Sequence, residues 1–122
     1  MGRDPLRESA ARALLKALEA YESHFAAMIA EDMASQFHWA ASRSLDEVRG
    51  AASSNASDML ARVTELVIAH SRLSAKLWQR QMARHHAGSA PVPASDVDVL
   101  REEHRHALAR LRDRCHAILS KG

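Results

Sequence analysis

Residues 58–86 read DMLARVTELVIAHSRLSAKLWQRQMARHH and form the most regularly patterned stretch of the chain. Apolar side chains recur in it at steps of three and four residues, which is the period of an amphipathic α-helix. The predicted helix carries Met59, Leu60, Val63, Leu66, Val67, His70, Leu73, Leu77, Trp78 and Met82. Gly88 and the prolines at 91 and 93 cannot continue a helix, so this one is predicted to end near His86.

The same period extends through the residues before this stretch. From Pro5 to Val48 the apolar positions keep helical spacing, and no Gly or Pro interrupts them. This pattern predicts either one very long helix over residues 5–49 or two helices that meet near residues 42–44. Ser44 and Glu47 fit a capping box, which favours a restart there. Asp4 followed by Pro5 is a typical helix start.

A last helix is predicted after the proline-containing segment, with Ser95 and Asp96 as its cap. Its stripe holds Val97, Leu100, His104, Ala107, Leu108, Leu111, Cys115 and Ile118. Linkers are expected near residues 50–57, which read GAASSNAS, and near residues 87–95. Asn55, Ser57 and Asp58 are candidate caps for the helix that follows the first linker. The chain is thus predicted to be one all-α domain over residues 1–122, with three or four amphipathic helices in an extended, coiled-coil-like bundle.

The composition points to a thin core. Hydrophobic residues make up 47% of the 122 residues, but many are alanine and aromatics are only 4%. Alanine buries little apolar area, so self-association is a natural way to bury more, and we predict a homo-oligomer. No apolar run approaches the ~18 residues of a membrane span, and no apolar segment follows the first basic residue. The predicted location is therefore the cytoplasm.

Neither metal nor redox chemistry is predicted. Cys115 is the only cysteine, which excludes an internal disulfide, and its place in an apolar stripe favours a buried side chain over a reactive thiol. No two of the eight histidines stand four residues apart, and Glu103 with His106 is the only Glu-x-x-His pair. We expect no metal and no cofactor. His70 and His104 lie within apolar stripes and are interpreted as hydrogen-bonded interior histidines, with a pH-sensing pair as the alternative.

Two further patterns allow function hypotheses. Arg80 with His85, and Arg101 with His106, show the Arg-x4-His spacing of helical ribonuclease toxins, although the Arg and His content alone gives such pairs by chance. In addition, a basic ridge repeats every four residues and consists of Arg72, Lys76, Arg80 and Arg84. The ridge could contact an anionic surface or phosphates, or it could be the solvated face of an ordinary helix. Nucleic-acid binding is not expected, because aromatic residues do not interleave with the basic ones.

Residues 35–84 resemble phasins, the proteins that coat polyhydroxyalkanoate granules in bacteria. The resemblance is carried by Ser44-Leu45-Asp46-Glu47-Val48-Arg49 at the end of one helix. It continues in the small-residue linker Ala51–Ser57, in Asp58-Met59-Leu60 at the next helix start, and in Val63-Thr64-Glu65-Leu66. It implies a non-enzymatic protein that binds the polyester granule surface.

Three functions are thus carried forward from the sequence. The first is a granule-coating amphipathic protein that binds through Met59, Leu66, Leu73, Leu77 and Trp78, with the basic ridge in a lesser role. The second, from a different class, is a helical module that binds or regulates another protein. The third is a ribonuclease that uses Arg80 and His85.

Overall fold

The computed structural model describes residues 5–31, 33, 35–52, 57–86, 88 and 90–120. Within these residues the chain forms α1 (Pro5–Ala30), α2 (Ser35–Ala52), α3 (Ser57–His85) and α4 (Ala94–Ser120), and no strand. The prediction of an all-α fold built from packed amphipathic helices is therefore confirmed.

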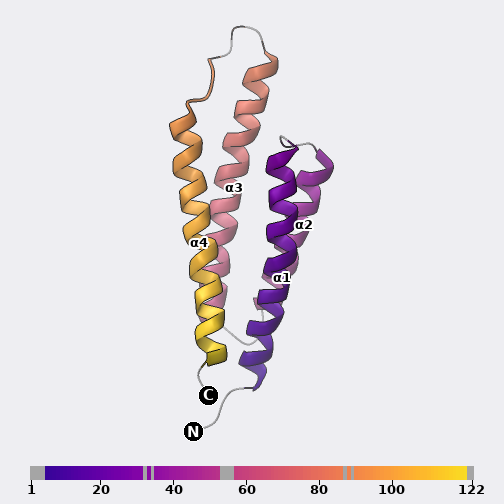
Figure 1. Ribbon diagram of the computed structural model, residues 1–122, viewed down its shortest axis with the longest axis vertical. Coiled ribbons are helices and arrows are strands. Elements are labelled where there is room, and N and C mark those ends of the chain that lie inside the picture. Colours follow the sequence, from indigo (N-terminus) through magenta and orange to yellow (C-terminus); the bar gives the residue numbers. More distant parts are fainter. Residues whose placement is uncertain are drawn as a thin grey trace.

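The four helices form a bundle of two hairpins (Figure 1). α1 packs most extensively on α2, and we call this pair the N-terminal hairpin. α3 packs on α4 as the C-terminal hairpin, while the contacts of α1 with α4 and of α2 with α3 join the two hairpins less extensively. α3 and α4 extend beyond the end of the N-terminal hairpin, because α2 has only 18 residues against 29 in α3.

The break between the first two helices is not where the sequence pattern placed it. α1 ends at Ala30 and α2 begins at Ser35, whereas residues 42–44 lie inside α2. Met33 turns the chain with a φ of 65°, and its N–H donates to the carbonyl of Met28 at 2.9 Å. A positive φ is unfavourable for a residue with a side chain, and burial of Met33 in the core offsets that cost.

Ser44 illustrates why the predicted capping box does not form. Its side chain is buried inside the bundle, and its hydroxyl hydrogen-bonds to His24 Nδ1 of α1. A hydroxyl partnered across the helix interface no longer competes for the backbone, so the helix runs through it. Asp4 and Asn55, two of the predicted caps, lie outside the described residues.

The remaining helix ends differ slightly from the predicted linkers. Gly50, Ala51 and Ala52 are still helical, and helix resumes at Ser57. α4 starts at Ala94, one residue before the predicted cap, and the N–H of Asp96 donates to the carbonyl of Pro93 at 3.1 Å.

The core is built from two apolar clusters stacked along the bundle axis. One gathers leucines of α1, α3 and α4 around Leu14, Leu66 and Leu111, and the other surrounds Met28, Leu73 and Leu100. The half-buried ring of Phe25 packs against both. In the described part of the chain, no helix is long and apolar enough to cross a membrane.

Candidate functional site

The five residues predicted to bind a surface lie on the inner side of α3. We call Met59, Leu66, Leu73, Leu77 and Trp78 the inner stripe. Its first four members are at most 3% exposed, and Trp78 is half-buried with its ring edge-on to His38 at 5.6 Å between centroids. In the closed bundle the inner stripe therefore packs against the other helices. Any role of these residues in binding a surface requires the hairpins to separate.

The basic ridge mainly ties α3 to α4. Arg72 Nη1 lies 2.7 Å from Glu103 Oε2, and Lys76 Nζ lies 3.9 Å from Asp96 Oδ2. Arg80 is half-buried, and with Arg84 it lines a small hollow against the segment before α4. Because two of its four cations are paired with carboxylates of α4, the basic ridge presents less free charge to an anionic surface.

A groove with a volume of about 790 Å³ runs along the outer side of the C-terminal hairpin. Its floor is formed by Ala69 of α3 and Ala107 of α4, which are too small to fill the space between the two helices. Ile68 and Val99 border this floor and are 54% and 59% exposed. The α3–α4 groove therefore carries an apolar strip that no part of the described chain covers.

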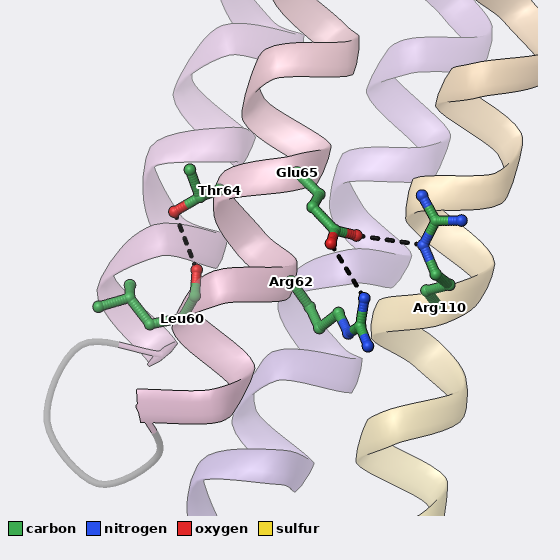
Figure 2. A network of polar contacts seen from close by, with 5 residues as sticks. All are labelled: Leu60, Arg62, Thr64, Glu65 and Arg110. Carbon is green, nitrogen blue, oxygen red and sulfur yellow. Dashed lines mark hydrogen bonds and ion pairs between the residues drawn. The ribbon is translucent and has the colours of Figure 1, made fainter.

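Charged side chains line both ends of the α3–α4 groove. At one end, Glu65 accepts hydrogen bonds from Arg62 of α3 at 2.9 Å and from Arg110 of α4 at 3.1 Å (Figure 2). On the other side of α3, the Thr64 hydroxyl donates to the Leu60 carbonyl at 3.0 Å (Figure 2). Because Glu65 bridges the two helices beside the hollow, its contacts hold this end of the groove in shape.

The opposite end of the groove is acidic. It is lined by Asp98, Glu102 and Glu103, with Arg72 as the cation that pairs with Glu103. The side chains of Arg105 and His106 both contact the carboxylate of Glu102. The hydrogen bond from Arg105 lowers the pKa of this carboxyl group. The lowered pKa keeps the carboxylate of Glu102 ionised at neutral pH.

A polar layer lies inside the bundle and consists of Tyr21 of α1, His70 of α3 and His104 of α4. The Tyr21 hydroxyl oxygen is 2.7 Å from His70 Nδ1 and 2.7 Å from His104 Nε2. A hydroxyl carries one proton, so it donates to one imidazole and accepts an N–H from the other. On the far side of His70, Nε2 lies 3.4 Å from Ser74 Oγ. The prediction of hydrogen-bonded interior histidines is confirmed.

Burial keeps the polar layer uncharged. It lowers the pKa of His70 to about 4, and a smaller contribution comes from His38. The pKa of His104 is also lowered to about 4, first by burial and then by His70. Burial, followed by the nearby carboxylate of Glu22, raises the pKa of the Tyr21 hydroxyl far above its usual value. Burial therefore favours neutral imidazoles in the folded bundle at neutral pH.

The aromatic rings around this layer fix its position between the two core clusters. Phe25 stacks on His104 with 4.2 Å between ring centroids and 15° between ring planes. A hollow of about 350 Å³ between α1 and α4 has Tyr21 and His104 in its lining and Arg101 and Arg105 on the α4 side. The layer thus lies close to the seam along which the hairpins meet.

Of the two residues named in the ribonuclease hypothesis, Arg80 is half-buried and His85 is exposed. The members of the second Arg-x4-His pair lie in different hollows. Arg101 lines the hollow beside α1, whereas His106 lines the groove beside α3, because positions five residues apart on a helix point about 140° apart. Within the described residues, no three His, Cys, Asp or Glu side chains gather where they could hold a metal ion. Cys115 is buried with its Sγ 3.8 Å from Met59 Sδ, and burial raises its thiol pKa to about 11.

Sequence reasoning missed three residues that shape these sites. The sequence pattern shows Tyr21 only as one of the apolar positions between Pro5 and Val48, and it gives Ile68 and Val99 no role in a site. The position of Ile68 beside Ala69, out of step with the stripe of α3, was the available signal of an outward apolar side chain.

Comparison with protein-family models, curated proteins and solved structures found no match in any of the three.

Proposed function

We propose that this chain is a non-enzymatic helical protein that coats an apolar surface, with polyhydroxyalkanoate granules as the candidate surface. The resemblance of residues 35–84 to phasins suggests the surface. The structural observation that supports the proposal is the placement of the polar layer at the seam between two hairpins that each pack mainly on themselves. A bundle built in this way can open along one seam without dismantling either hairpin.

Opening would convert the bundle into two separate helical hairpins, each with one apolar and one charged side. The inner stripe of α3 would then face the apolar surface, and the charged outer sides would face water. Burial of apolar area against the polymer would replace the burial lost from the core. The polar layer lowers the net cost of opening, because the separated Tyr and His side chains regain water as a hydrogen-bond partner.

A helical interaction module that acts in the closed conformation is the second candidate. It is favoured by the α3–α4 groove, whose apolar strip is available without any opening. In that case the inner stripe serves only the core, and the groove binds a second copy of the chain, as argued below.

Adsorption to poly(3-hydroxybutyrate) particles is expected to rise at least tenfold when the pH is lowered from about 7 to about 5. In the open state His70 and His104 are hydrated and take up protons near pH 6.5, so acid makes opening easier. The measurement is co-sedimentation with the particles across a range of protein concentrations at each pH.

The matched control replaces the polar layer by apolar side chains in the variant Tyr21→Phe, His70→Leu, His104→Leu. The other six histidines remain, so any effect of overall charge on adsorption is retained. The variant should show less than about a threefold rise over the same pH range, since it has no imidazole in this layer that could take up a proton when the bundle opens. No adsorption by the wild type, or an equal rise for both proteins, would rule out coating by opening.

A further inference from the structure

The two ends of the α3–α4 groove carry opposite excess charge. At one end the single carboxylate of Glu65 is shared by Arg62 and Arg110, which leaves one positive charge in excess. At the other end Arg72 pairs with Glu103 and Arg105 with Glu102, which leaves the negative charge of Asp98 in excess. A surface with one excess charge of each sign at its two ends is complementary to a copy of itself turned end to end.

The positions of these charges suit a two-fold axis through the middle of the groove. On α4, Asp98 and Arg110 stand six residues on either side of His104, or about 9 Å each way at 1.5 Å per residue. A two-fold axis that lies in the interface and crosses the groove at this level brings Asp98 of one copy to the level of Arg110 of the other. The same rotation repeats the contact at the opposite end.

The exposed apolar residues Ile68 and Val99 also lie at nearly matching levels on either side of this axis. The ion pairs Arg72–Glu103 and Glu65–Arg110 set the relative level of the two helices, and they place Ile68 level with Ala107. Ile68 thus lies three residues from the middle towards one end, and Val99 lies five residues towards the other. After the rotation, Ile68 of one copy is within about 3 Å, measured along the groove, of the level of Val99 of the other.

We infer that the α3–α4 groove is the interface of a symmetric antiparallel dimer. Ile68 and Val99 of the two copies together cover the exposed apolar strip, and two Asp98–Arg110 contacts fix the direction of pairing. The apolar area is modest, so the dimer is a weak one with a dissociation constant on the order of 10–100 µM. This contact uses the outer side of the C-terminal hairpin and leaves the seam between the hairpins free.

Sedimentation equilibrium over about 5–500 µM protein tests the interface without any polymer particles. Ile68→Arg is expected to weaken dimerisation at least tenfold, because it buries a cation beside the apolar strip. Leu60→Arg is the matched control: Leu60 is 41% exposed on the same helix, does not line the groove and points away from Glu65 and Arg110 (Figure 2). This variant should dimerise within about twofold of the wild type. A wild type that stays monomeric throughout, or equal effects of the two variants, would overturn the inference.

Charge reversal tests the direction of pairing. Asp98→Lys and Arg110→Glu should each be monomeric at about 100 µM when studied alone, since each places like charges opposite each other. Mixed in equal amounts, the two variants should form a heterodimer, in which every facing pair has opposite sign again. Circular dichroism first establishes that each variant is as helical as the wild type. Absence of the heterodimer from the mixture would refute the antiparallel arrangement.

Discussion

Lowering the pH from about 7 to about 4 is expected to remove roughly 5 kcal/mol from the free energy of unfolding, which is a large part of the about 5–15 kcal/mol that stabilises a native protein. The loss arises from His70 and His104, which are neutral in the folded bundle and lie within hydrogen-bond distance of Tyr21. Each pKa is lowered from 6.5 to about 4, and one pKa unit corresponds to about 1.4 kcal/mol. The two sites interact, so their contributions add to less than the full sum.

The direction follows from which state binds protons. The unfolded chain protonates its imidazoles below about pH 6.5, whereas the folded chain excludes protons until about pH 4. The contribution is therefore complete above pH 6.5, is lost as the pH falls through this window, and does not change further below it. Besides each other, the two imidazoles face Tyr21 on α1 and His38 on α2, and Glu22 is the carboxylate next to the hydroxyl.

Urea denaturation at a series of pH values measures this loss. The variant Tyr21→Phe, His70→Leu, His104→Leu retains every carboxylate and the six other histidines, so the difference between its curve and that of the wild type isolates the polar layer. The variant should lose at least about 3 kcal/mol less than the wild type between the same pH values. If both proteins lose stability in parallel, the polar layer does not determine the acid sensitivity.

Leu66→Ala is expected to destabilise the protein by about 3 kcal/mol, whereas Ile68→Ala should cost less than about 1 kcal/mol. The two residues are neighbours on α3 with similar side chains, but Leu66 is fully buried and Ile68 is 54% exposed. Truncation of Leu66 leaves a cavity in a core that has few large side chains to fill it. Denaturant unfolding of both variants gives the comparison, and a smaller loss for Leu66→Ala than for Ile68→Ala would contradict the orientation of α3.

The helical content and the facing of the stripes could be predicted from the sequence, because the apolar period sets which side of each helix is buried. The stripe of α3 that contains Leu66 and Leu73 does face the core. The break after Ala30 could not be predicted, since no Gly or Pro marks it and Met33 adopts its positive φ only because the core accepts its side chain. Tertiary packing overrode local propensity at this turn.

The sites were harder to predict for a related reason. A single helix pattern shows that a residue such as Leu77 lies on an apolar face, but not whether another helix of the same chain covers that face. The partners of Arg72 and Lys76 are on α4, far away in the sequence, so the interhelical ion pairs of these two ridge residues could not be recognised. Likewise, the α3–α4 groove depends on two alanines from different helices meeting at one level.

The proposed function requires the bundle to open on an apolar surface, and a distance across the seam between the hairpins measures that opening. In a Cys115→Ala background, spin labels on Ser23→Cys of α1 and Ala109→Cys of α4 report the distance between the two hairpins. Positions 23, 71 and 109 are exposed. Labels on Ser71→Cys of α3 and Ala109→Cys provide the matched pair within the C-terminal hairpin. Pulsed electron paramagnetic resonance gives both distances in solution and on poly(3-hydroxybutyrate) particles.

On the particles, the distance between positions 23 and 109 should grow by at least one helix diameter, about 10 Å, while the distance between positions 71 and 109 should change by less than about 3 Å. This outcome means that the hairpins separate while each keeps its own packing. Adsorbed protein in which both distances equal those in solution would contradict the account, because the inner stripe would then remain in the core.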